Sequence, residues 1–361
     1  MTNQAATPHT YPCQSCGAHV EFAPGTGALR CPYCGHEQAV PQAPRQQVRE
    51  HSWDELMSKP RRSVRESGTH HFVCRQCGAQ TESDTLSSKC QFCAAPLVAD
   101  TTDAELVAPE AVVPFALDRS KARDALRVWV KSRWFAPNRL KRVTEAESSK
   151  STYLPHWTFD ARTASSYVGA RGTYYYVTET YTDNGQTRTR QVRRTAWSPA
   201  SGQVARDFDD VLVLGTRRVA PEKLAELEPW ALHQAAPYDP AYLAGHTSLR
   251  YDVEPEAGLT DAKDKMASVI NRDCRDDIGG DEQRVDQVNT NYADVTYKLM
   301  LLPVWICCYL FAGKTWQVLI NGVSGEVQGQ RPYSVAKIVA AVVAGLAVAA
   351  AIITLIVLNK N

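Results

Sequence analysis

The chain has 361 residues, a formal net charge of +1, 44% hydrophobic residues and 22% charged residues. This near-neutral composition excludes a globally basic nucleic-acid-binding chain and an acidic disordered one. The length leaves room for small modules and one or two packed cores. We expect an α+β protein with two small N-terminal zinc ribbons, a body of helices and antiparallel sheet, and one C-terminal transmembrane helix.

Four Cys-x-x-Cys pairs stand out in the first hundred residues and use most of the 11 cysteines. Each pair presents two thiolates, and two pairs complete a tetrahedron around a zinc ion at about 2.3 Å per bond. The spacing predicts ribbons over residues 1–40 and 72–98, each with one structural Zn²⁺, and a linker over 41–71. Because the linker separates the modules, loss of one metal should leave the body folded. The expected ligands are Cys13, Cys16, Cys31, Cys34, Cys74, Cys77, Cys90 and Cys93.

The body is expected over residues 105–333 and begins with an amphipathic helix. Asp118 can cap a helix that runs to about Arg133, with an apolar stripe on one side and a basic outer face. With Trp134 and Phe135 nearby, this basic face could bind anionic lipid headgroups or nucleic acid, or could be an ordinary solvated surface. The candidate residues are Arg119, Arg123, Arg127, Lys131, Arg139, Lys141 and Arg142.

Strands are expected from Tyr153 onward, because residues 165–182 are rich in Tyr, Val and Thr. Asn184 and Gly185 predict a tight hairpin turn, since this pair accepts positive φ at both central positions. Further on, the patterns predict a strand over 208–214, a short helix over 221–228 and an amphipathic helix over 260–278.

Two short motifs occur twice in the body. Leu-Pro-x-Trp occurs at residues 154–157 and 302–305, and Ser-Gly followed by Gln or Glu and Val occurs at 201–204 and 324–327. One amphipathic helix precedes each Leu-Pro-x-Trp motif. The pattern predicts a duplicated unit, with coincidence as the alternative. The two copies would span about 110–215 and 250–330.

The segment 338–358 contains only Ile, Val, Ala, Leu, one Gly and one Thr. At roughly 1.5 Å per residue it would span about 31 Å, the thickness of the hydrocarbon core of a bilayer. The N-terminus lacks a signal-like segment, so we expect a tail-anchored, single-pass protein of the cytoplasmic membrane with its N-terminal bulk in the cytosol. Ala341, Gly345 and Ala349 form a small-residue face that favours homo-oligomers, although an Ala-rich helix can show such a face by chance.

Several motifs together suggest a family. They are YPCQSCGA at 11–18, FAPG at 22–25, WFAP at 134–137, YDPAYLAG at 238–245 and LPVW at 302–305. With these motifs the chain resembles bacterial membrane-anchored proteins that carry a zinc ribbon like that of transcription factor IIB, often labelled primosomal-helicase-like. Some members are similar to proteins encoded beside phage-shock and flotillin-like components. The resemblance implies an adaptor in membrane-stress response, with such membrane proteins as partners.

The residues therefore predict a non-enzymatic scaffold that recruits protein partners to the membrane, with the ribbons as the contact surface. Gly313-Lys314-Thr315 ends like a phosphate-binding loop, but Cys308 stands where the first glycine of that loop belongs. One alternative is a membrane-tethered nucleic-acid-binding zinc-ribbon protein. Another is an enzyme, which would need a deep polar cleft around His156 or His246.

Overall fold

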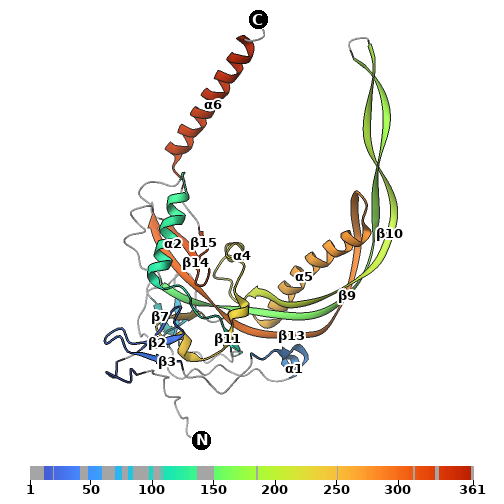
Figure 1. Cartoon of the computed structure of the whole chain (residues 1–361). Coiled ribbons are helices and arrows are strands. Elements are labelled where there is room, and N and C mark those ends of the chain that lie inside the picture. The colour runs from blue at the N-terminus through green and yellow to red at the C-terminus, as the bar shows by residue number, and fades with distance from the viewer. Residues whose placement is uncertain are drawn as a thin grey trace.

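The computed structural model describes residues 12–18, 20–40, 48–58, 70–74, 80–83, 97–100, 107, 109–135, 150–183, 186–249, 251–311, 314–329 and 333–358. Side chains are described in these segments except at 70–74, 80–83, 97–100, 240, 308–311, 314–315 and 356–358. The described segments form a small N-terminal sheet, a large curved sheet with helices on both sides, and a C-terminal helix that projects from the body (Figure 1).

The N-terminal module is a three-stranded antiparallel sheet of very short strands. Phe22 and Leu29 pair across its first two strands and are both buried. They belong to the same hydrophobic core as Phe115 and Tyr153 of the body, and the Phe22 amide donates to the Ala244 carbonyl at 2.9 Å. The N-terminal module and the body therefore share one hydrophobic core. The strands are β1 (Glu21–Ala23), β2 (Ala28–Arg30) and β3 (Glu37–Ala39).

Three long antiparallel strands form the centre of the body: β9 (Lys150–Asp183), β10 (Gln186–Leu214) and β13 (Glu282–Phe311). β9 lies in the middle and pairs with β10 along one edge and with β13 along the other. Bulges interrupt the pairing at Phe208/Val211, Val285/Gln287 and Ala293/Thr296, and bulges bend strands. The result is the strongly curved sheet of Figure 1.

Shorter strands extend this sheet at its margins. β12 (Thr247–Leu249) pairs in parallel with β9 and antiparallel with β6 (Gln80–Ser83), so main-chain hydrogen bonds join β6 to the body. β4 also pairs with β13, which places part of the predicted linker on the body. The marginal strands are β4 (His51–Ser52), β5 (His70–Cys74), β6 (Gln80–Ser83), β7 (Leu97–Asp100), β8 (Ala111–Val112), β11 (Ala236–Pro237), β12 (Thr247–Leu249), β14 (Lys314–Asn321) and β15 (Val327–Gly329).

Part of the β9–β10 hairpin leaves the sheet as a free ribbon, which we call the arm and define as residues 173–183 and 186–196. The β9–β13 pairing ends at Gly172, and in the described part of the chain β9 continues beyond it with β10 alone. From the Thr173–Ala196 pair to the Asp183–Gln186 pair the arm is about 36 Å long, at roughly 3.3 Å per residue. It rises from one end of the curved sheet (Figure 1).

Helices cover both sides of the sheet. α5 (Pro255–Ile278) lies along the inner side of the curve and buries Ala262, Met266 and Ile270 against β9, β10 and β13 (Figure 1). α1 (Trp53–Ser58) packs the Trp53 ring edge-on against Phe159 and Tyr297. The remaining elements are α2 (Arg119–Ser132), α4 (Pro221–Ala225), η1 (Leu232–Gln234) and η2 (Pro240–Leu243).

α2 begins where the sequence predicts, because the Asp118 carboxylate accepts from the amides of Ser120 and Lys121. α5 begins five residues before the predicted start, with Pro255 in its first turn, where the missing N–H of proline leaves no bond unmade. α4 ends at Ala225, three residues before the predicted end.

α6 (Val335–Leu358) is the one candidate membrane span among the described residues. Its window Val335–Leu355 has a mean hydropathy of 2.7, and none of it is buried in the protein. An apolar helix of this length with no protein cover is consistent with a single-pass membrane protein. α6 leaves the body beside the C-terminal end of α2 and rises on the same side as the arm (Figure 1).

The two Leu-Pro-x-Trp motifs lie next to each other, because Leu154 pairs with Leu302 across β9 and β13. The second repeated motif occupies two different environments, since residues 201–204 are inside β10, whereas 324–326 precede β15 and Val327 is its first residue. The duplication stays a prediction.

Candidate metal centre and its surroundings

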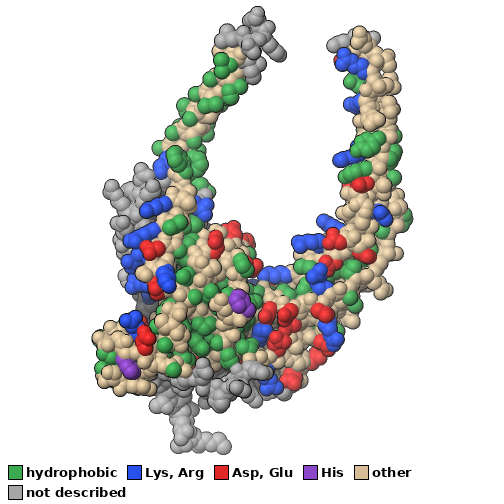
Figure 2. Space-filling view, in the orientation of Figure 1, with side chains coloured by type: hydrophobic (Ala, Val, Ile, Leu, Met, Phe, Trp, Pro, Cys, Tyr) green, Lys and Arg blue, Asp and Glu red, His purple; other side chains and the backbone are tan. Residues whose placement is uncertain are grey.

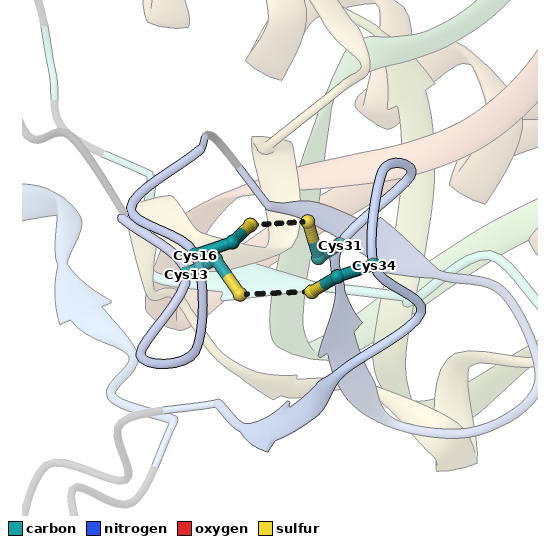
Figure 3. A group of neighbouring side chains, drawn as sticks. All are labelled: Cys13, Cys16, Cys31 and Cys34. Carbon is teal, nitrogen blue, oxygen red and sulfur yellow. Dashed lines mark hydrogen bonds between the residues drawn. The ribbon is translucent and has the colours of Figure 1, made fainter.

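Four cysteines of the N-terminal module converge from two turns of the same shape (Figure 3). In the first turn the Gly17 amide donates to the Cys13 carbonyl and the Cys13 amide to the Ala18 carbonyl. In the second turn Gly35 and Cys31 make the equivalent bonds, the latter to the carbonyl of His36. Both glycines have φ of +75°, a conformation that L side chains rarely adopt. The glycine after each second cysteine is therefore what lets the turn close.

The four sulfur atoms form a compact group. Cys13 Sγ lies 3.6 Å from Cys34 Sγ, and Cys16 Sγ lies 3.6 Å from Cys31 Sγ (Figure 3). All four ligand atoms lie within 4.8 Å of one another. An S–S bond is about 2.0 Å long, so these are not disulfides. A tetrahedron with metal–sulfur bonds of about 2.3 Å has edges of about 3.8 Å, so the quartet is close enough to bind a metal ion.

Backbone amides favour the thiolate form at two of these positions. The amide of Cys34, followed by that of Tyr33, lowers the pKa of Cys31 to about 6. Burial acts to raise the pKa of Cys13, but the amides of Cys16 and Ser15 outweigh it and lower that pKa. The thiolate is the form that binds metal.

Cys16 behaves differently. The Ala18 amide acts to lower its pKa, but the sulfur atoms of Cys31 and Cys34 raise it to about 12. A fourth thiolate beside three sulfur atoms needs a neighbouring positive charge, and a bound cation supplies it. The donor set therefore fits a metal ion.

The second predicted quartet lies mostly outside the described residues. Cys74 ends β5, where only the backbone is described, and Cys77, Cys90 and Cys93 fall outside the described segments. The second metal site stays a prediction.

An acidic group that sequence reasoning missed lies under the sheet bulges. Carboxylates of Glu50, Asp160, Asp209 and Asp210 come within 4.8 Å of one another. The buried Lys298 ammonium lies 2.9 Å from Glu50 and 2.5 Å from Asp210. Burial, with the nearby Glu50 carboxylate, raises the pKa of Asp160 to about 6. Lys298 supplies a counter-charge, so this group is an ion cluster around one buried lysine, with Glu50 and Asp209 exposed and Asp160 and Asp210 half-buried. Its signal in the sequence was a single charged residue in the apolar run 295–307.

His156 and His246 are both packed side chains. His156 bonds through Nδ1 to the Leu154 carbonyl at 3.0 Å and lines a largely apolar cavity of about 340 Å³ with Trp230. His246 stacks on the Phe115 ring, with centroids 4.6 Å apart. Burial lowers the pKa of each to about 4. Neither imidazole contacts a carboxylate among the described residues, so the arrangement offers no acid–base pair.

The predicted surface residues are only partly described. Arg119, Arg123, Arg127 and Lys131 lie exposed on α2, and Figure 2 shows Lys and Arg gathered over that helix. Arg139, Lys141 and Arg142 lie outside the described residues. Ala341, Gly345 and Ala349 are exposed on α6, and self-association through them stays a prediction.

The arm is the main functional candidate that sequence reasoning missed. Tyr175, Tyr176 and Tyr181 are exposed on it, Tyr176 by 64%. Four arginines of β10 lie along it, and Figure 2 shows basic side chains spread along the arm. They are partly neutralised, since Glu179 pairs with two of them and Asp183 with one. The Asn-Gly turn signalled the hairpin but not its length. These arginines are Arg188, Arg190, Arg193 and Arg194.

These features define a mixed α/β protein with one four-cysteine metal-binding candidate and one candidate membrane span in its described part. No protein-family model and no solved structure matches the chain. The chain is 30% identical over 332 residues to the uncharacterized protein YdjG of Bacillus subtilis (strain 168), and the aligned region covers 92% of each sequence. It therefore belongs to the same family as YdjG.

Proposed function

We propose that the protein is a membrane-anchored adaptor that holds a protein partner at the cytoplasmic membrane, with its body on the cytosolic side. The observation that carries this proposal is the arm, because it is a long two-stranded hairpin that no further strand pairs with in the described chain and that contacts residues 281–282 only at its base, through Tyr174. A two-stranded hairpin alone is only marginally stable in water. Its exposed tyrosines and arginines are residue types enriched at protein interfaces.

The edges of the arm support a docking role. Along 186–196 the outer edge of β10 pairs with no other strand in the described structure, and along 175–183 the outer edge of β9 pairs with none either, whereas the Tyr174 amide donates to Asp281 Oδ2 at 2.7 Å. Unpaired edges are templates for an added strand from another chain. Stacked Arg–Tyr pairs preorganise part of the surface, with the Arg193 guanidinium 4.2 Å from the Tyr174 ring centroid.

We assign zinc to the cysteine quartet and a structural role to the zinc. Four cysteine thiolates in tetrahedral arrangement suit Zn²⁺, and iron is the main competitor. A four-thiolate site leaves no open position for water or substrate. The reducing cytosol keeps such thiols available for metal, which supports the proposed orientation. Elemental analysis of the purified chain distinguishes zinc from iron.

The N-terminal zinc ribbon is the second candidate contact surface. Tyr33 lies between the paired cysteines of the second turn and is 82% exposed. An aromatic side chain at the tip of a metal-stabilised turn is held in place at little entropic cost, which favours recognition.

A photo-crosslinking amino acid placed at Tyr176, at Tyr33 or at the exposed control position Glu222 tests the adaptor function in native membranes. We expect a discrete adduct with one protein from Tyr176, from Tyr33 or from both, and none from Glu222. The absence of a discrete adduct from both tyrosine positions would overturn the adaptor proposal.

The alternative of a membrane-tethered nucleic-acid-binding protein rests on the basic face of α2. Phosphate contacts to nucleic acid weaken steeply with salt. Retention of the solubilised chain on single-stranded and duplex DNA at rising salt tests this alternative directly.

A further inference from the structure

The junction between α2 and α6 brings together residues about 200 positions apart in the sequence. The Ser334 amide donates to the Phe135 carbonyl at 2.8 Å, and Lys337 Nζ donates to the Trp134 carbonyl at 3.2 Å. These contacts fix the C-terminal end of α2 at the point where the apolar helix leaves the body. Any bilayer that encloses α6 therefore begins beside Trp134 and Phe135.

The side chains at this junction have the character of an interfacial belt. Trp134 is 77% exposed and Tyr333 is 58% exposed, although both are large rings. Trp and Tyr are enriched where a membrane protein meets the headgroups. Lys131, Arg133 and Lys337 add three positive charges, and residues 128–135 and 333–337 contain no acidic residue.

Two hydrogen-bond donors at the junction lack an acceptor among the described residues. Arg133 Nε and Trp129 Nε1 are both buried atoms without a partner. The Arg133 guanidinium lies 5.1 Å from the Trp129 ring centroid, so the two donors are neighbours. Buried donors are nearly always satisfied, and a pair left open beside positive charge fits an anionic oxygen.

Carbonyl oxygens at the C-terminal end of a helix carry partial negative charge and disfavour a nearby anion. At the end of α2, two of these carbonyls already accept hydrogen bonds from the protein. At this end Ser132 Oγ donates to the Trp129 carbonyl at 2.7 Å, and the Arg133 amide donates to the Val130 carbonyl at 3.2 Å.

We propose that this junction binds the headgroup of an anionic phospholipid. A phosphate oxygen accepts from Arg133, Lys131 and Lys337 add charge, and the Trp134 and Tyr333 rings lie at the level of the headgroups. Headgroup binding at this site fixes the orientation of the body relative to the membrane. The proposal rests on insertion of α6, which is part of the proposed function. The position of the site at the base of an apolar helix favours lipid over nucleic acid.

Binding of short-chain phosphatidylglycerol to the full chain in neutral detergent tests the site. Arg133→Gln should weaken this binding by about tenfold, as expected for loss of one charge-assisted hydrogen bond. Arg123→Gln removes the same charge from the same helix, far from the junction, and should bind like the parent. Short-chain phosphatidylcholine and inorganic phosphate should bind the parent more weakly than phosphatidylglycerol does.

Equal weakening in the two variants, or equal binding of phosphatidylglycerol and phosphatidylcholine, would overturn the proposal, as would tighter binding of a DNA oligonucleotide than of lipid. If Arg133→Gln fails to fold, quenching of tryptophan fluorescence by brominated phosphatidylglycerol in vesicles still tests whether the junction contacts this lipid. Trp134→Phe should remove much of the quenching and Trp53→Phe little, and an equal effect of the two would overturn the site. Carbonate extraction of the vesicles reports separately whether α6 is inserted.

Discussion

The cysteine quartet shows at the residue scale how a local motif can stabilise a distant part of the fold. The metal that we propose would hold together two turns whose strands carry Phe22 and Leu29. These side chains share one core with Phe115 of the body. A structural metal contributes about 10–16 kcal/mol of apparent binding energy to a small zinc ribbon, so we expect this module to depend on the proposed metal to fold.

We expect Cys16→Ser to remove about one metal ion per chain and to destabilise the body as well, by about 2–4 kcal/mol, because the packing of Phe22 and Leu29 on it is lost. Metal analysis and urea unfolding of the full chain measure the two effects. Cys274→Ser changes a buried thiol on α5 and should leave the metal content unchanged. A body that keeps its stability in Cys16→Ser would mean that the shared core contributes little.

The ion cluster around Lys298 predicts a dependence of stability on pH. Burial raises the pKa of Asp160 to about 6, above the ordinary value of about 3.9 for an unfolded chain. The stability that comes from its protonated form is complete below about pH 4 and is lost as the pH rises through about 6.

We therefore expect Asp160→Asn to be more stable than the parent above about pH 6, by about 1 kcal/mol after allowance for solvent screening. The asparagine oxygen can still accept from the Asp210 amide, and Thr296 can turn its proton toward Glu50. Urea unfolding of both proteins from about pH 4 to above about pH 6 measures the difference in their free energies of unfolding. A constant difference across the range would show that Asp160 does not titrate as described.

The local signals in the sequence predict most individual elements. The Asp118 cap, the stripe of α2 and the apolar run of α6 each act over a few neighbouring residues, and each predicted element is present. Asn184 and Gly185 lie outside the described residues, but β9 and β10 pair up to Asp183 and Gln186 on either side of them. The lengths of β9 and β10 were not predictable in the same way. In the arm the two strands are held mainly by pairing with each other, and no buried face gives the sequence a clear alternation.

The register of β9 against β13 depends on one close approach. A Cβ added at Gly169 would lie 2.2 Å from the Arg284 carbonyl oxygen and 3.2 Å from Ile278 Cδ1. Gly169→Ala should therefore destabilise the protein by about 1–3 kcal/mol, since a backbone atom cannot move aside without breaking the ladder. Thermal unfolding measures this. Val168→Ala, at the exposed neighbouring position, should change stability by less than about 0.5 kcal/mol.

At the scale of the whole molecule, the sequence did not reveal which modules join. The first ribbon shares its core with the body, and β6 pairs with β12, because of contacts between residues far apart in the chain. The composition of a linker says nothing about such contacts. The same holds for the proposed lipid site, whose halves come from α2 and α6. Periodicity and motif spacing are local, and these features are not.

The arm and α6 rise on the same side of the body in Figure 1, from opposite ends of the curved sheet, and have similar lengths, since 24 residues of helix also span about 36 Å. A bilayer deep enough to enclose α6 would therefore reach the arm. The arm has four arginines and two unpaired edges, and hydrocarbon does not tolerate unpaired backbone groups. The helix and the arm cannot both keep these directions once the helix is inserted.

We therefore expect insertion of α6 to widen the angle between the helix and the arm until the arm lies outside the headgroup layer. The membrane would then set the direction in which the arm points. Spin labels at Thr187 and Ala336 report this by their separation, which should be larger in lipid nanodiscs than in detergent. An unchanged separation would mean that α6 does not cross the bilayer. At this wider angle the arm would lie at a fixed height above the membrane surface and contact partners that are confined to that surface.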